Sequence, residues 1–219
     1  MPLFLLIRHA ENDFVKKRRL AGRQPGVHLN EKGRQQAQAL AQTLAQKLAD
    51  QPVRGIYCSP MERAIETAEP IAQALGLEVL PRPALIETDY GEWQGKSLRA
   101  LARLKVWRTV LSRPSQMRFP GGESFAEAQH RIQREIEDLC AQHDAKDIIL
   151  CVSHADPIKL AVAYYLGLPL DLFQRLTVNT ASITALHIGE FGSQLLTLNY
   201  DLSFPLPMLS PGKPPAKEK

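Results

Sequence analysis

The amino-acid sequence predicts an α/β protein, specifically a three-layer α/β/α sandwich with a mostly parallel central sheet. Residues 3–8 and 147–153 form continuous apolar runs without alternation, which is typical of strands buried on both faces. Residues 31–49 place apolar side chains at the spacing of an α-helix. Because strands and helices alternate along the chain, we expect a parallel sheet with helices on both faces.

The remaining elements follow in chain order. Ser59, Pro60 and Glu62 form a capping-box pattern that predicts the start of a helix, and Gly76 predicts its end. Asp156 is expected to cap a later helix. The other expected elements are strands at 55–58 and 77–80, helices at 97–111, 123–142 and 156–166, and β-rich runs at 175–179, 182–188 and 194–199.

The composition is that of a folded domain followed by a tail. Of the 219 residues, 44% are hydrophobic and 23% are charged, which excludes a mostly disordered chain or a rod-like fibre. We expect residues 1–202 to form one domain. Residues 203–219 include five prolines, so an extended tail is predicted there.

Several classes of partner and location are disfavoured. No apolar run reaches the roughly 18 residues of a membrane helix, and residues 3–7 are too few for a signal peptide. The three cysteines are widely spaced and suit a reducing compartment, so we expect a cytoplasmic protein without a membrane partner. The net charge of +4 comes mainly from residues 16–19 and the C-terminal segment, so no nucleic-acid-binding face is expected. Residues 16–19 are either a solvated loop or a fringe that attracts an anionic substrate.

Five residues with catalytic side chains follow predicted strands. Arg8 and His9 follow the first strand, Arg63 follows the 55–58 strand, Glu87 lies on a loop after the 77–80 strand, and His154 follows the strand that ends near 153. Ligands of such sheets bind beyond the carboxyl ends of the strands. If the first and fourth strands are neighbours, their ends lie about 5 Å apart, and the two histidines could meet across one small group.

This set of side chains suits a phosphate group. Arginine binds two phosphate oxygens at once and keeps its charge, and helix N-termini offer free N–H groups. A histidine can attack phosphorus, and Glu87 can protonate the departing alcohol and then activate water. Since Arg8, Arg63 and His154 supply positive charge, no metal and no cofactor are expected.

The motifs that carry these residues resemble those of the histidine phosphatase superfamily, in its phosphoglycerate-mutase-like branch. The resemblance implies that His9 is phosphorylated, that Arg8, Arg63 and His154 surround the phosphoryl group, and that Glu87 donates the proton. The matching pieces are LIRHAEND at 5–12, LAGRQPGVHLNEKGRQQA at 20–37, YCSPMERAIETAEPIA at 57–72, LIETDYGEWQGKS at 85–97, PGGES at 120–124 and VSHADP at 152–157.

The resemblance also suggests contacts with the rest of the substrate. Gly22 and Arg23 match the loop that makes such contacts. Asn12 stands where the family commonly has Thr or Ser, and Ala155 stands where it usually has Gly. We expect both to contact the substrate, with a pocket shape that differs from the usual one. Segments 10–30 and 97–125 are expected to set specificity.

The expected activity is metal-independent hydrolysis of a small phosphomonoester through a phosphohistidine. The insert typical of glycolytic mutases is not evident between Gly95 and Pro120, which favours a phosphatase. Two alternatives stay open: a phosphoglycerate-type phosphomutase, and a non-catalytic phosphate-binding regulatory protein that would not need His9 or Glu87. A homodimer is also left open. The other four histidines are expected to be structural or exposed.

Overall fold

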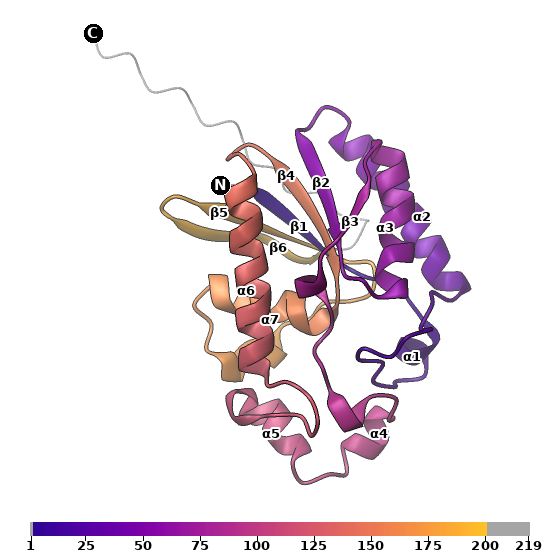
Figure 1. The fold of residues 1–219 in the computed structure, drawn as a ribbon, viewed down its shortest axis with the longest axis vertical. Helices are drawn as coiled ribbons and strands as arrows, with labels where there is room; N and C mark the ends of the chain where they lie inside the picture. The colour runs from indigo at the N-terminus through magenta and orange to yellow at the C-terminus, as the bar shows by residue number, and fades with distance from the viewer. Residues whose placement is uncertain (1, 201–219) are drawn as a thin grey trace.

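The computed structural model describes residues 2–200, so the predicted tail at 203–219 lies outside the described residues. Its core is a six-stranded sheet in which β5 alone runs in the direction opposite to the other five strands (Figure 1). The spatial order is β3-β2-β4-β1-β5-β6. The strands are β1 (Leu3–Arg8), β2 (Val53–Cys58), β3 (Val79–Pro81), β4 (Ile148–Ser153), β5 (Ile183–Gly189) and β6 (Gly192–Tyr200).

Helices cover both faces of the sheet, which confirms the predicted three layers. One face carries α2 (Glu31–Leu48) and α3 (Glu62–Leu75), and the other carries α6 (Phe125–Gln142) and α7 (Ala155–Tyr165) (Figure 1). Strand β1 shows why its run has no polar alternation. Its odd-numbered apolar residues join the core under α2 and α3, while Phe4 and Leu6 join the core under α6 and α7.

Short elements gather at the end of the molecule toward which the parallel strands run. Figure 1 shows α1, α4 and α5 at this end, below the sheet. These elements lie on long connections rather than in the layers. They are α1 (Asp13–Lys16), α4 (Leu98–Leu101), α5 (Trp107–Ser112) and the 3₁₀ turns Pro83–Leu85, Gly91–Trp93, Pro114–Gln116 and Leu170–Arg175.

Two expected elements are wrong. The helix predicted at 97–111 is two short helices, because an exposed turn at 102–106 lets Leu101 and Val110 both reach the same core. The β-rich run at 175–179 forms no strand. Instead the carbonyl of Val178 accepts a hydrogen bond from the guanidinium of Arg8, at 2.7 Å.

Two predicted helix caps are also wrong, and both residues act elsewhere. Helix α3 starts at Glu62 after Met61 and has no side-chain cap, since the hydroxyl of Ser59 bonds to His154. Helix α7 starts after His154, and Asp156 is its second residue. Among residues 2–200, no helix is both long and apolar enough to cross a membrane.

Candidate active site

Strands β1 and β4 place the two predicted histidines at neighbouring strand ends. The strands are adjacent and parallel, with Arg8 opposite Ser153, so His9 and His154 leave the same edge of the sheet. The centroids of their rings are 5.1 Å apart, and the ring planes meet at 61°. Both side chains are buried. The structure therefore brings the two histidines within reach of one small group, as the predicted strand order implies.

Two arginines beside these rings, the buried Arg63 and the half-buried Arg8, have buried donors without partners among the described residues. The guanidinium of Arg63 donates to the carbonyl of Gly22 at 2.7 Å, but its Nε and Nη1 bond to nothing among the described residues. The Nε of Arg8 is likewise unpaired. Leaving a buried donor unpaired costs about 1–3 kcal/mol, so an anion placed here is stabilised. We call His9, His154, Arg8 and Arg63 the histidine end of the site.

Asn12 and Ala155 add further donors at this end. The Asn12 side-chain oxygen caps α1 by accepting from the amide of Val15 at 2.9 Å, while its Nδ2 is buried and unpaired within residues 2–200. Ala155 opens α7, whose N-cap residue makes no side-chain cap bond. Free amides in the first turn of a helix favour an anion. Both residues line the cavity, and their contact with the substrate stays a prediction.

The hydrogen bond of His9 defines which ring nitrogen can react. Its Nδ1 lies 2.7 Å from the carbonyl oxygen of Ala10, which can only accept, so we assign the proton to Nδ1. The Nε2 then carries a lone pair and has no hydrogen bond among the described residues. Burial and the charges of Arg63 and Arg8 hold the pKa of His9 well below its usual value. The ring is therefore neutral at physiological pH, as a nucleophile must be.

His154 is oriented from both sides. The guanidinium of Arg63 donates to its Nδ1 at 3.2 Å, so the proton of the neutral ring lies on Nε2. That nitrogen lies 2.8 Å from the hydroxyl oxygen of Ser59, which accepts. Burial, followed by the charge of Arg63, lowers the pKa of His154 well below its usual value. Ser59 is thus a positioning residue, although its sequence context predicts a helix cap.

Glu87 lies beside the histidine end and is suited to hold a proton. Its carboxylate accepts from the amide of Thr88 at 2.9 Å and approaches Nδ1 of His154 to 3.9 Å. Burial, with a further contribution from the negative charge of Asp156, raises the pKa of Glu87 to about 7. A carboxyl group with this pKa can give up and take back a proton near neutral pH.

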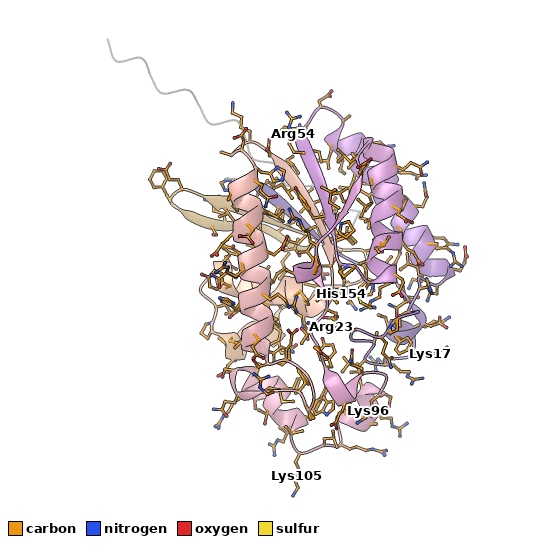
Figure 2. The ribbon with its side chains drawn as sticks, viewed as in Figure 1. Lys17, Arg23, Arg54, Lys96, Lys105 and His154 are labelled. Carbon is orange, nitrogen blue, oxygen red and sulfur yellow. The ribbon has the colours of Figure 1, made fainter. Side chains whose placement is uncertain are left out.

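Arg23 holds the loop that carries Glu87. Its Nε donates to the Glu87 carbonyl at 2.8 Å, and its Nη2 donates to the Glu123 carboxylate at 2.9 Å. The same carboxylate oxygen accepts from Arg131, which also donates to the carbonyls of Ala84 and Ile86. Arg23 is not among the residues that line the cavity, so its expected contact with the substrate stays a prediction. In Figure 2, Arg23 and His154 are labelled in the middle of the view, whereas Lys17 and Lys105 lie at its margin; the Arg23 side chain is 28% exposed.

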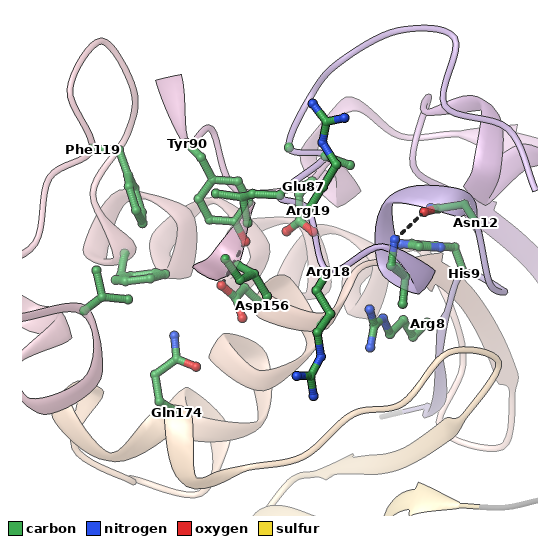
Figure 3. A pocket seen from close by; sticks show the side chains of 18 of the residues that line it. Arg8, His9, Asn12, Arg18, Arg19, Glu87, Tyr90, Phe119, Asp156 and Gln174 are labelled. Carbon is green, nitrogen blue, oxygen red and sulfur yellow. Dashed lines mark hydrogen bonds between the residues drawn. The ribbon is translucent and has the colours of Figure 1, made fainter. Parts of the chain in front are cut away.

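The cavity in front of the histidine end has a volume of about 320 Å³. Figure 3 shows His9 and Arg8 on one side of it and Phe119 on the other, with Arg18 and Asp156 between them. Both segments expected to set specificity contribute to its wall. From 10–30 these are Asn12, Val15, Arg18, Arg19, Leu20, Ala21 and Gly22, and from 97–125 they are Leu98, Trp107, Val110, Leu111, Phe119 and Phe125.

Comparison with known proteins identifies the family of this site. A model described as histidine phosphatase superfamily (branch 1) matches residues 4–201. The chain belongs to the histidine phosphatase superfamily. The predicted membership is therefore confirmed.

Relatives within the superfamily carry different names. Phosphoserine phosphatase 1 of Hydrogenobacter thermophilus is 31% identical over 91% of this chain and 92% of its own length. Probable phosphoglycerate mutase GpmB of Erwinia tasmaniensis is 32% identical over 82% of this chain and 81% of its own length. The crystal structure of phosphoserine phosphatase from Entamoeba histolytica, in complex with 3-phosphoglyceric acid, matches with a TM-score of 0.80 and 26% identity. That match covers 92% of this chain and 98% of the other.

Within this superfamily member, sequence reasoning missed several cavity residues. Tyr90, Asp156 and Gln174 line the cavity but are not among the predicted site residues. Asp156 directly follows the Ser-His pair, which was a usable signal. Gln174 comes from a 3₁₀ turn far along the chain, and nothing local indicates its position. Within the described part of the chain, no group of three or more His, Cys, Asp or Glu residues is arranged to hold a metal ion.

Proposed function

We propose that this protein hydrolyses small phosphomonoesters through a phosphohistidine formed on His9. One observation carries the proposal: a neutral histidine with a free Nε2 faces a cavity that it shares with unpaired donors of Arg8 and Arg63. A protein that only binds phosphate needs the arginines. It does not need a histidine held in its nucleophilic tautomer, nor a carboxyl group with a pKa near 7 beside it.

The reaction proceeds in two balanced steps. The Nε2 lone pair of His9 attacks phosphorus, the bond from phosphorus to the ester oxygen breaks, and Glu87 gives its proton to that oxygen. The alcohol leaves. Glu87, now a carboxylate, takes a proton from water while the water oxygen attacks phosphorus and the bond to Nε2 breaks. Phosphate leaves, and both residues return to their starting states.

Fixed hydrogen-bond donors stabilise the negative charge that develops on the phosphoryl oxygens. Arg8, Arg63, the amide of Asn12 and the first-turn amides of α7 all lie around the cavity. Donors already held in place cost no reorganisation when the charge moves, which makes them effective in catalysis. We propose on this basis that neither a metal nor a cofactor takes part.

A second candidate function is phosphoryl transfer between positions of a phosphoglycerate. It is supported by the 32% identity to a probable phosphoglycerate mutase. A mutase must protect its phosphoenzyme from water until the substrate has turned. We favour the phosphatase because the segment between Gly95 and Pro120 has no evident mutase insert.

A screen of phosphomonoesters in the presence of EDTA tests the proposal. We expect turnover of several substrates, unchanged by the chelator, and slower interconversion of phosphoglycerates than hydrolysis of the best substrate. Binding of phosphate without any hydrolysis supports the regulatory alternative instead. A loss of activity in EDTA that a divalent metal restores contradicts the proposed mechanism. The cytoplasmic location and the homodimer stay predictions.

A further inference from the structure

Most of the cavity lies beyond the reach of the phosphate. The phosphoryl group belongs at the histidine end, which takes up only one side of a cavity of about 320 Å³ (Figure 3). The residues of segment 97–125 that line this cavity are all apolar, and Phe119 among them lies on the opposite side (Figure 3). They are Leu98, Trp107, Val110, Leu111, Phe119 and Phe125. A substrate with its phosphoryl group at the histidine end can place its alcohol part only in the rest of the cavity, where these side chains form much of the wall.

The apolar wall is held in place by aromatic packing. Phe119 makes edge contacts with Tyr90, Trp93 and Phe125, with ring centroids 5.0, 5.4 and 5.2 Å apart. Trp107 stacks on Trp93 at 6.0 Å. Such contacts keep the rings in fixed positions, so the wall exists before a ligand binds. A preformed apolar surface favours an apolar ligand, because burying apolar area removes it from water.

Apart from the exposed Arg18, the charged side chains beyond the histidine end already have hydrogen-bond or ion-pair partners. One carboxylate oxygen of Asp156 accepts from the hydroxyl of Tyr90 at 2.9 Å, and the other pairs with Lys159 at 2.8 Å. Lys159 also donates to the side-chain oxygen of Gln174. The guanidinium of Arg19 is held by the carbonyl of Gly95. A substrate amino group would therefore lose its hydration without finding a free carboxylate at Asp156.

We propose that the substrates are phosphomonoesters of alcohols whose body is apolar and about the size of one aromatic ring. This deepens the proposed function and depends on it. The wall made by Trp107, Val110 and Phe119 selects the alcohol by its apolar area. Small zwitterionic or carboxylated alcohols, such as serine or glyceric acid, gain nothing from this surface.

A matched pair of substrates measures the selection. We compare 2-phenylethyl phosphate with ethyl phosphate, both esters of primary alcohols that need the same proton from Glu87. Burying the additional ring should raise kcat/KM by about 10- to 100-fold. O-phosphoserine and 3-phosphoglycerate lack an apolar body and should stay well below 2-phenylethyl phosphate, because attraction of their carboxylate to the exposed Arg18 changes KM only a few-fold. A higher kcat/KM for either of them than for 2-phenylethyl phosphate overturns the inference.

Two leucines of one segment provide a variant and its control. Leu111 lines the cavity and is 55% exposed, so Leu111→Asn should fold. It should lower the ratio of kcat/KM for 2-phenylethyl over ethyl phosphate about 3-fold or more. Leu104 is 41% exposed and does not line the cavity, so Leu104→Asn should leave the ratio unchanged. Trp107→Ala should lower the ratio further. An unchanged ratio in both Leu111→Asn and Trp107→Ala contradicts the inference.

Failure of this inference is distinguishable from failure of the proposed function. If the protein hydrolyses p-nitrophenyl phosphate and ethyl phosphate but shows no preference for the phenylethyl ester, only the substrate class is wrong. If it hydrolyses none of the three esters, the proposed function is wrong. Circular dichroism of each variant establishes that a changed ratio comes from a folded protein.

Discussion

The two sides of the cavity are built in different ways. The histidine end is formed by the last residue of β1, the residues that directly follow β1 and β4, and the first turn of α3, so the sheet register places its side chains. The opposite side is formed largely by residues 91–125, which we call the capping segment. Its helices are one or two turns long, and its side chains are placed by an aromatic cluster. In this arrangement the sheet supplies the catalytic side chains, and the capping segment selects the alcohol.

The largest expected effect comes from removing the nucleophile at the histidine end. His9→Ala should slow hydrolysis of every phosphomonoester by roughly 10³-fold or more, because each leaving group needs the same attacking nitrogen. Initial rates with p-nitrophenyl phosphate and with an alkyl phosphate measure this loss. His130→Ala is the control, since His130 is exposed on α6 and does not line the cavity. A loss that depended strongly on the leaving group would argue against a nucleophilic His9.

The next effect separates proton transfer from nucleophilic attack. Glu87→Gln should slow alkyl phosphates by about 10²–10⁴-fold, and p-nitrophenyl phosphate far less, because a phenolate leaves without a proton. The control is Glu92→Gln, an exposed neighbour in the same part of the chain. If breakdown of the phosphoenzyme limits the rate, the burst of p-nitrophenol gives the proper comparison. If Glu87→Gln slowed the first turnover of alkyl phosphates and of p-nitrophenyl phosphate equally, Glu87 would not be the acid.

The pH dependence of the same reaction follows from two shifted pKa values. His9 must be neutral, and its pKa is lowered, so it stays reactive below neutral pH. Glu87 must be protonated, and its pKa is about 7, so kcat/KM for alkyl phosphates should fall as pH rises through about 7. This basic limb should be absent in Glu87→Gln. A wild-type profile that stays flat from pH 6 to pH 9 contradicts the assignment.

A smaller effect tests the link between the capping segment and the chemistry. Arg23→Ala frees the Glu87 carbonyl and one side of Glu123, so the acid should lose its position. We expect alkyl phosphates to slow about 10-fold, with a weaker effect on p-nitrophenyl phosphate. Arg118→Ala is a matched control, because Arg118 is exposed and pairs with Glu127 away from the cavity. A rise in KM alone, equal for both substrates, would instead favour a direct substrate contact for Arg23.

The smallest effect concerns the cavity rim. Arg18 lines the cavity and is exposed, and no hydrogen bond or ion pair holds its guanidinium among residues 2–200. Arg18→Ala should raise KM a few-fold for substrates with a second anionic group and leave neutral alcohol phosphates unchanged. This difference in KM between anionic and neutral substrates should shrink at high salt, because exposed charges are screened. An equal effect on neutral and anionic substrates would place Arg18 among the phosphate ligands.

The difference between side chains placed by the sheet and side chains placed by tertiary packing also explains which features the sequence could predict. Buried strands have unbroken apolar runs, so β1 and β4 and the positions of His9 and His154 follow from local pattern. In contrast, Ser59 and Asp156 satisfy the rules for helix caps, yet tertiary partners decide their hydrogen bonds. The break between α4 and α5 has the same origin, since apolar spacing alone cannot show that both halves pack on one core. Gln174 could not be found because no local signal brings a distant turn to the cavity.

Rapid-quench labelling tests the central claim most directly. The wild-type protein is mixed with a ³²P-labelled phosphomonoester in the presence of EDTA and quenched within the first turnover. We predict a phosphate that is stable in alkali, labile in acid and attached to His9, and that appears before free phosphate and decays as it is released. Release of phosphate with no labelled protein, or with the label on another residue, contradicts the account.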